Sequence, residues 1–479
     1  MLNVTAADYP DIAFFNSGGE RFPFDALPVQ DLMKALAAGT GTDAAAFTGG
    51  RALTLESLDQ TMADVLWTDR HVLLFKALRK QAVYAVLDTW NQRSSYGGDW
   101  ATAMTEGGSP AVSDTDIARM IGVVKYYRDK REVTHVMTLV QSTEAAMAEE
   151  ETSGTRRILG RVETDLFTGD QTIFPTRIHG LLPIAVGQGG DLVYDAHGGA
   201  ITADEAYHYL AGVVYKEGGY LTDVYHSPAC QADVDHALAS AQRFVLPIST
   251  DGRVVAGVSQ RALATAHGVM NFQADRFIRC GWDMAAPNAG AGPEPPATPT
   301  VNSVLGNAGT IYSQENLPAG DYYVRVSNVC EAGESAASAA QSVTLTAGNV
   351  IRINVTCGAA TATGYRVYLS AKDAADGTDC RFHCEFAKVG DGAGQDLDLD
   401  GHWVTGTTAI HLLSLDAGTD ALDIRQLLPL LKMDLAIVGP AFPFLLNLYL
   451  YLRAKKPNFH TAILNVLPSN VAGWNPLAA

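Results

Sequence analysis

Residues 116–140, DIARMIGVVKYYRDKREVTHVMTLV, are the stretch that decides the fold. They are rich in Val, Ile, Tyr and Thr, which are typical of strands, whereas residues 90–110 before them hold four glycines and few apolar side chains. We therefore predict that residues 88–140 form a long two-stranded excursion. An arm of about 20 residues would reach about 65 Å, which is longer than a compact domain can cover with its own surface.

An isolated two-stranded hairpin is marginally stable at best in water, so we expect something outside the subunit to support this excursion. The alternative is a pair of strands inside an ordinary sheet, which the periodicity fits as well. Basic residues follow the returning strand, namely Arg119, Lys125, Arg128, Lys130 and Arg131.

A long helix is predicted over residues 144–167, with Thr143 as its N-cap. Acidic residues, among them Glu149 and Glu150, lie toward its N-terminal end, where the helix dipole favours negative charge. At about 1.5 Å per residue the helix would be roughly 35 Å long. Gly154 and Gly160 mark either a bend or a close contact, and Gly169 supplies the stop.

The flanking segments carry weaker patterns. Turn residues dominate residues 1–50 and predict an arm with one small helix, and residues 53–87 predict a helix pair or a helix followed by a strand. Residues 170–286 alternate between helix and strand, which is typical of a compact α/β lobe. Its predicted elements are helices near residues 202–214 and 227–241 and a strand over residues 254–258.

A sharp shift in composition follows at residues 287–299, which hold seven Pro and Gly residues and predict a linker. Short runs of alternating apolar residues then recur between turn residues, and they predict an immunoglobulin-like sandwich that ends near Asp400. These runs cover residues 322–326, 343–345, 351–355 and 365–369.

The C-terminal part predicts a helix around residues 423–431 and a buried strand within residues 435–452. The second stretch has 18 residues without a charge, which is the threshold length for a membrane helix. Gly439, Pro440 and Pro443 interrupt it, and its later leucines alternate with Asn and Tyr. Period two favours a strand over a membrane span.

Composition limits the classes of function. Of 479 residues 47% are hydrophobic and 18% charged, which predicts a folded chain. Lys plus Arg number 34 against 52 Asp plus Glu, a net charge of −18 that disfavours wrapping nucleic acid by phosphate contacts. The low charge, together with 45 Gly, suggests surface buried between subunits. No secretory signal is expected from the first ten residues, and six Cys are too sparse for a disulfide scaffold and are expected as reduced thiols.

No motif for a named reaction is present, so no catalytic residue, cofactor site or metal site is predicted, and we expect a structural protein that is not an enzyme. Three weaker constellations favour ordinary structural roles. Cys380, His383 and Cys384 lack a second pair for a metal. Asp396, Asp398 and Asp400 match half of a calcium loop that has Thr407 in place of its final Glu. His197 and His208 could approach Asp204.

Seven short segments, taken in order, resemble the major capsid proteins of tailed bacteriophages, which have the Hong Kong 97-type fold. They are residues 105–110 (TEGGSP), 123–127 (VVKYY), 133–140 (VTHVMTLV), 166–170 (LFTGD), 225–228 (YHSP), 243–247 (RFVLP) and 421–429 (ALDIRQLLP). The resemblance implies an α+β fold with an N-terminal arm, an extended loop, a spine helix, and peripheral and axial domains. The chain looks like the subgroup that carries an inserted all-β immunoglobulin-like or fibronectin-like sandwich.

The resemblance also assigns the parts of the chain. They would be the arm (1–52), the start of the peripheral domain (53–87), the extended loop (88–140), the spine helix with more of the peripheral domain (141–189), the axial domain (190–250), return strands (251–286), a linker (287–298), the inserted domain (299–400) and the C-terminal part of the peripheral domain (401–479). It implies inter-subunit contacts, for which the predicted residues are Arg119, Lys125, Arg128, Arg131, Glu149 and Glu150.

The function implied is that of a major capsid protein, which assembles with itself into the hexamers and pentamers of an icosahedral phage head. Portal and scaffolding proteins, and decoration proteins, would be its partners. The shell would form in the host cytoplasm, enclose double-stranded DNA without sequence-specific binding, and involve no membrane. Two alternatives remain: an encapsulin-type shell of the same fold, and a modular enzyme that carries an immunoglobulin-like domain.

Overall fold

The computed structural model describes residues 67–97, 106–108, 113–139, 145–201, 203–240, 261–278, 287, 289–309, 317–390, 392–399, 403–416, 418–437 and 439–469. It divides the chain into two compact units, Met1–Ala63 and Asp64–Ala479, and every described residue belongs to the second. The predicted arm over residues 1–52 and the strand over residues 254–258 lie outside the described residues. The N-cap of the long helix is Ala145 and not the predicted Thr143. The described chain mixes helices and strands, in keeping with the α+β class.

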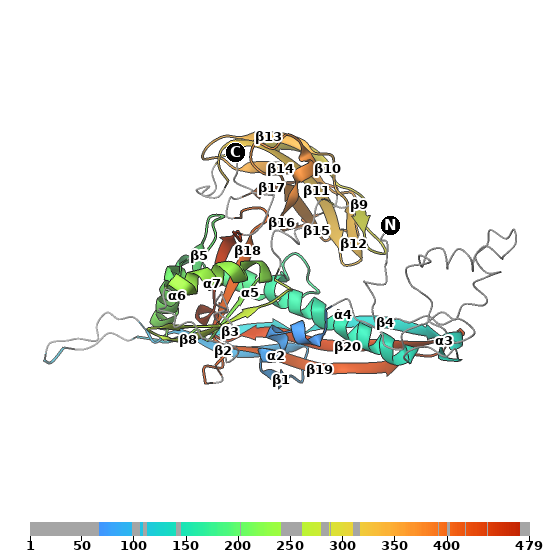
Figure 1. Ribbon diagram of the computed structural model, residues 1–479, viewed down its shortest axis with the longest axis horizontal. Helices are drawn as coiled ribbons and strands as arrows, with labels where there is room; N and C mark the ends of the chain where they lie inside the picture. The colour runs from blue at the N-terminus through green and yellow to red at the C-terminus, as the bar shows by residue number, and fades with distance from the viewer. Residues whose placement is uncertain are drawn as a thin grey trace, which may run out of the picture. The chain divides into compact units, whose positions relative to one another are not determined.

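One long four-stranded sheet and one long helix form the main body (Figure 1). The strands lie in the order β1-β19-β20-β4, and only β1 is parallel to its neighbour. Their bounds are β1 Lys80–Ala82, β4 Lys125–Thr134, β19 Leu422–Asp434 and β20 Ala441–Ala454, and the helix is α4, Ala146–Thr168. Apolar side chains of α4 and of the even-numbered positions 444–452 of β20 share one buried core, because side chains two apart on a strand lie on the same face.

The glycines of α4 bring the helix close to its neighbours, as one of the two predicted readings had it. A Cβ atom on Gly154 would lie 2.6 Å from Leu446 Cδ1, and one on Gly160 would lie 2.5 Å from the Trp67 ring. Gly169 ends the helix as predicted. Its φ is −62°, so the glycine is needed for space, since a Cβ there would lie 2.5 Å from the Asp165 carbonyl oxygen.

Two predictions for the body are wrong. The helix expected around residues 423–431 is instead part of β19, which pairs with β20 along its length. The returning strand expected from residue 117 to residue 140 is divided: β3 (Asp116–Val123) ends before Val124, β4 belongs to the four-stranded sheet, and His135–Leu139 forms the short helix α3. The predicted two-stranded excursion is therefore right for β3 and its partner strand, and the alternative of strands inside an ordinary sheet is right for β4. The strand predicted within residues 435–452 is confirmed as β20.

The hairpin is the two-stranded sheet of β2 (Leu87–Ser95) and β3, which are antiparallel from the Leu87–Val123 pair outward. Figure 1 shows this pair to one side of the four-stranded sheet. Of the residues between its strands, only 96, 97, 106–108 and 113–115 are described.

A second lobe is built on a six-stranded sheet in the order β5-β21-β18-β6-β8-β7. Its strands are β5 Val193–Asp195, β6 Asp223–His226, β7 Ala262–Thr265, β8 Gly268–Ala274, β18 Thr408–Leu413 and β21 Thr461–Val466. The helices are α5 Leu181–Gln188, α6 Glu205–Lys216 and α7 Gln231–Ser240, of which the last two confirm predicted helices. Side chains of α6 and of this sheet share a core.

Two antiparallel sheets between residues 289 and 399 enclose a core of their own; we call them the two-sheet region. One sheet has the order β10-β14-β17 and the other β16-β15-β11-β12-β9, with β13 paired to β11. Their bounds are β9 Ala289–Ala291, β10 Thr300–Leu305, β11 Gly320–Cys330, β12 Gly333–Ala336, β13 Gln341–Leu345, β14 Ile351–Thr356, β15 Gly364–Leu369, β16 Arg381–Ala387 and β17 Gly394–Leu399. The four predicted alternating runs are strands, whereas the predicted linker contributes β9.

Short helical turns complete the described elements: α2 Leu74–Ala77 and the 3-10 turns Asp69–His71, Gly190–Leu192, Pro228–Cys230, Gly377–Asp379 and Pro457–Phe459. No helix among the described residues is long and apolar enough to cross a membrane.

Candidate assembly surface

Cys380 and His383, two of the three residues of the weak metal constellation, contact different residues. The Cys380 thiol lies 3.5 Å from the Tyr323 carbonyl oxygen, and burial raises the pKa of this thiol to about 11. His383 Nδ1 lies 3.0 Å from Thr405 Oγ1, and burial lowers the pKa of the His383 ring to about 4. Both side chains are buried, which is typical of a structural thiol and a neutral core histidine.

Two aspartates of the half calcium loop bind side chains of the neighbouring strand β14. Asp398 pairs with Arg352 Nε at 2.6 Å, and Asp396 accepts a hydrogen bond from the Asn354 amide, whereas Asp400 lies outside the described residues. Within the described part of the chain no group of three or more Asp, Glu, His or Cys side chains could hold a metal ion.

The structure brings together one of the two histidines expected near Asp204. His208 Nε2 lies 3.4 Å from Asp204, whereas His197 lies beside Asp195, at 3.7 Å.

The hairpin presents one face of apolar side chains to solvent. Residues opposite each other on paired strands share a face, so Leu87, Val123, Ile121 and Ile117 form a single row. Their exposed fractions are 60%, 41%, 63% and 62%, respectively. We call these four side chains the apolar row. Arg119 lies between Ile121 and Ile117 on this face. Several large apolar side chains exposed together on one face are typical of a surface that another molecule covers.

The opposite face of the hairpin packs on the body at the hairpin's root. Val83, Val124 and Tyr451 form a small buried cluster there, with Trp90 and Tyr449 packed against it. Contacts of this face therefore hold the hairpin on the four-stranded sheet and leave the apolar row free.

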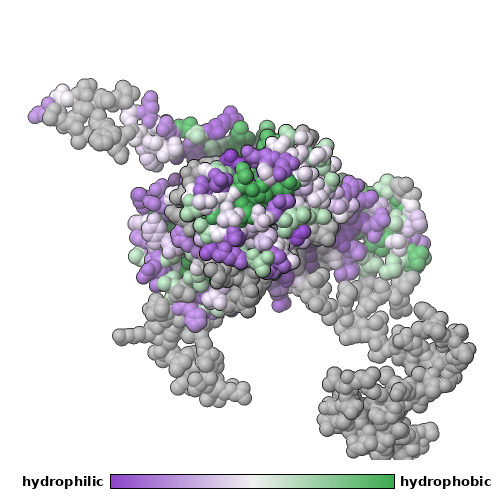
Figure 2. Space-filling model, turned by 90° about the horizontal axis from the view of Figure 1, so that it is seen from above, coloured by the Kyte–Doolittle hydropathy of each residue, from purple (hydrophilic) through white to green (hydrophobic). Residues whose placement is uncertain are grey.

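A second exposed apolar surface lies at the far end of the four-stranded sheet. The exposed side chains are Val136, Met137 and Leu139 of α3, and Leu430, Leu431, Met433 and Ile437 at the end of β19 and in the turn that follows. In Figure 2, apolar (green) atoms gather over α3 at the right-hand end. The sequence did not indicate these exposed side chains, because residues 135–139 were predicted to lie in a strand and residues 423–431 in a helix.

The six predicted contact residues divide into two groups. Arg119 and Arg128 are exposed: Arg119 Nη2 donates to Thr89 Oγ1 at 3.2 Å on the apolar-row face, and Arg128 lies over the rings of Tyr126 and Tyr449. Both remain available to a second copy, and their role between subunits stays a prediction.

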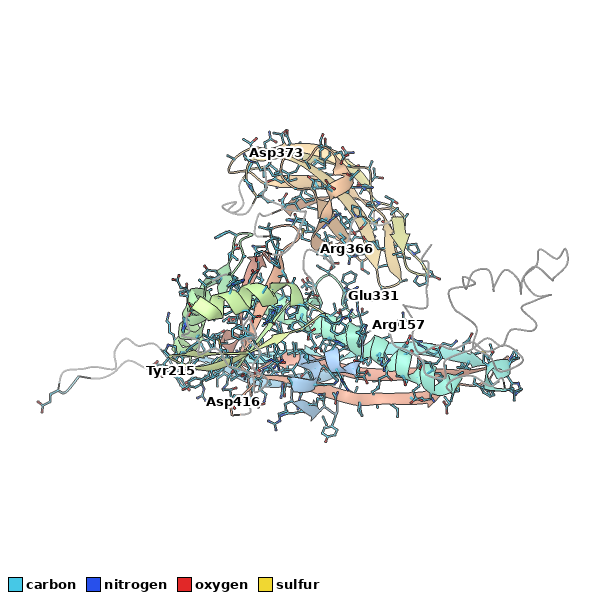
Figure 3. The ribbon with its side chains drawn as sticks, in the orientation of Figure 1. Arg157, Tyr215, Glu331, Arg366, Asp373 and Asp416 are labelled. Carbon is cyan, nitrogen blue, oxygen red and sulfur yellow. The ribbon has the colours of Figure 1, made fainter. Side chains whose placement is uncertain are left out.

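The other four are used within the subunit. Arg131 pairs with Glu150 at 2.6 Å, Lys125 Nζ donates to the Pro175 carbonyl at 2.6 Å, and Glu149 accepts from Ser153 at 3.1 Å. Arg157 (Figure 3) and Arg131 also bind the buried carboxylate of Asp129, which fixes α4 on β4.

Solved structures of low sequence identity are similar to this chain. They include the holo-SrpI encapsulin complex from Synechococcus elongatus PCC 7942 (11% identity, 91% of this chain and 99% of that chain, TM-score 0.44). A chain from Mycobacterium phage Bobi is 11% identical over 88% of this chain and 93% of its own, with a TM-score of 0.41. The capsid of a native GTA particle is 9% identical over 89% and 100%, with a TM-score of 0.44. No protein-family model and no curated protein matches the chain.

Proposed function

We propose that this chain is a shell subunit that assembles with copies of itself, and that the shell is the icosahedral head of a tailed double-stranded DNA bacteriophage. One observation carries the self-assembly: the described residues of the hairpin form two strands with a buried cluster only at the root, and they expose the apolar row. A two-stranded sheet of this kind needs a further layer to be stable. In an assembly of identical subunits, the further layer on the apolar row would come from a second copy of the chain.

The apolar row provides the energy for such a contact. Burying one Leu, Ile or Val side chain contributes roughly 1.5–3 kcal/mol relative to leaving it exposed. Exposed ion pairs contribute about 0.2–1 kcal/mol each, so the apolar row outweighs Arg119 and Arg128 in the contact. The apolar surface over α3 and the end of β19 offers a second contact, which a closed shell needs in addition to the first.

The finer parts of the proposal rest on the resemblance of the seven sequence segments to phage capsid proteins. They are hexamers and pentamers, association with portal, scaffolding and decoration proteins, and enclosure of double-stranded DNA in the virion. The net charge of −18 suits a shell that confines DNA without binding it tightly. We further propose that the two-sheet region is an inserted immunoglobulin-like domain and that the chain has a structural and not an enzymatic role.

The test is to express the full chain, alone and with a scaffolding protein, and to examine it by sedimentation and electron microscopy. We expect capsomers or closed shells. A stable 50.9 kDa monomer under every assembly condition would overturn the proposal and would favour the modular-enzyme alternative. Shells that hold only a protein cargo and no nuclease-protected DNA would overturn the phage assignment and favour the encapsulin alternative.

A further inference from the structure

The hairpin is joined to the body at a narrow root. The chain enters β2 after Val86 and leaves β3 into Val124, and the Val124 amide donates to the Val86 carbonyl at 3.0 Å. Two residues further out, Asp88 of β2 lies directly opposite Gly122 of β3. Both residues are on the face that packs on the body, opposite the apolar row.

A single carboxylate ties this root to both central strands of the sheet. Asp88 accepts a hydrogen bond from Arg425 Nε of β19 at 3.0 Å and another from the Tyr451 hydroxyl of β20. It also lies 3.7 Å from Arg453 Nη1 of β20. Burial alone would raise the pKa of Asp88, but the hydrogen bonds from Tyr451 and Arg425 outweigh burial and lower it, so the carboxylate stays charged at neutral pH.

The Tyr451 ring fills the space beside the same pair of residues. A Cβ atom on Gly122 would lie 2.2 Å from Tyr451 Cε2, so the hairpin backbone rests directly on the ring. Tyr451 therefore contacts both strands: its ring meets β3 and its hydroxyl meets Asp88 of β2. Among the described side chains of β2 and β3, that of Asp88 alone hydrogen-bonds to the four-stranded sheet.

We propose that Asp88, with Arg425 and Tyr451, is a clamp that sets the direction in which the hairpin leaves the sheet. This inference rests on the proposed self-assembly, and it makes Asp88 a positioning residue for that assembly. The nine residues of β2 span about 30 Å, so a change of about 10° at the root moves the tip by about 5 Å. A shift of that size carries the apolar row off a matched apolar surface, so the clamp selects one geometry of contact between copies.

The test compares Asp88→Asn with Asp420→Asn in the full chain. Asp420 is a matched control because its carboxylate pairs with Lys455 and Arg79 next to the same strands and does not contact the hairpin. In the unassembled subunit we expect Asp88→Asn to speed amide hydrogen exchange at least tenfold in residues 86–95 and 116–124 and to leave α4 unchanged. Asp420→Asn should leave the exchange of the hairpin unchanged.

Electron microscopy of assembly reactions gives the second readout. Wild-type and Asp420→Asn chains should form particles of one diameter, and Asp88→Asn should form mixed diameters or open sheets. Tyr451→Phe keeps the ring against Gly122 and removes only the hydroxyl, so it should give a smaller effect of the same kind without loss of folding. Unchanged hairpin exchange in both Asp88→Asn and Tyr451→Phe would overturn the clamp, as would unchanged particle diameters. If the wild-type chain forms no shell, the proposed function fails, and hydrogen exchange still decides whether the clamp exists.

Discussion

The hairpin and the two-sheet region are both strand-built parts of one chain, and they satisfy their apolar side chains in opposite ways. The two-sheet region encloses Val326, Ile353 and Val367 between two sheets, and all three are fully buried. The hairpin has one layer and leaves Ile117 and Ile121 more than 60% exposed. The two-sheet region therefore has a core of its own, whereas in the proposed assembly the hairpin is completed by another copy.

The largest expected effect is on assembly. Ile121→Asp places a charge in the middle of the apolar row, where a second copy would have to desolvate it, so we expect no shells to form. The isolated subunit should keep its thermal midpoint within a few degrees because Ile121 is exposed in it. Sedimentation and electron microscopy measure the first result, and a thermal melt measures the second.

The matched control is Val389→Asp in the two-sheet region, where Val389 is 72% exposed. This substitution should leave assembly intact, because the surface of a complete region needs no partner. Shells from Ile121→Asp, or loss of shells with Val389→Asp, would contradict the comparison.

The next effect is on the free energy of unfolding. Here a substitution in the two-sheet region should have a larger effect than one in the hairpin. Ile353→Ala empties part of a closed core, so we expect it to lower the free energy of unfolding by about 2–5 kcal/mol. Ile117→Ala, the same substitution on the exposed row, should change the stability of the unassembled subunit by less than about 0.5 kcal/mol. Urea unfolding followed by circular dichroism measures both. Equal losses would mean that the apolar row is buried in the free subunit.

The two-sheet region also differs from the rest of the described chain in the charges that it buries. The two-sheet region pairs opposite charges: Arg366 (Figure 3) binds the carboxylates of Glu334 and Glu385. Two like groups are buried where α4 meets the second lobe: Glu163 of α4 and Asp275, which follows β8. Glu163 accepts hydrogen bonds from the backbone amides of residues 74 and 75 at 2.6 and 2.9 Å. Other charged or titratable groups around this pair are His71, Lys80, Tyr225 and Arg276.

Burial, followed by the charge of Asp275, raises the pKa of Glu163 from 4.5 to about 8. The folded state therefore binds this proton more tightly than the unfolded chain does. The stability that the proton contributes is complete below about pH 4.5 and is lost as the pH rises through about 8. We expect the free energy of unfolding of the body to fall between pH 5 and pH 8 and Glu163→Gln to remove that slope. Urea unfolding at a series of pH values measures it, and an unchanged slope in Glu163→Gln would assign the pH dependence to other groups.

The sequence predicts correctly the elements that are determined by residues close together in the chain. The long helix, predicted over residues 144–167 and found over 146–168, is set by its own apolar stripe and terminal glycine. The strands of the two-sheet region follow period two because each has one face on a core. In β19 two shifts of register interrupt that alternation, and the leucines of residues 422–431 then imitate a helical spacing.

The candidate site was predictable only in part. Alternation in residues 117–123 indicates an apolar face, but the end of the hairpin at Val124 depends on β4 pairing with β20, more than 300 residues away. The donors to Asp88 are equally remote in sequence, at Arg425 and Tyr451. Arg131 and Glu150 were predicted to contact other subunits but pair with each other, since the packing of α4 on β4 brings them together.

The smallest expected effect separates charge from apolar burial within the hairpin itself. Arg119 lies between Ile117 and Ile121 on the apolar-row face, where its guanidinium donates to Thr89 and is exposed. Exposed charge contacts contribute about 0.2–1 kcal/mol, so Arg119→Ala should raise the subunit concentration needed for assembly by less than about sixfold. Salt screens such contacts, so the difference from wild type should shrink at high ionic strength. Arg352→Ala, which breaks a pair with Asp398 on the two-sheet region, should leave that concentration unchanged. Light scattering during assembly measures all three chains, and an effect of Arg119→Ala as large as that of Ile121→Asp would show that charge, and not the apolar row, holds the copies together.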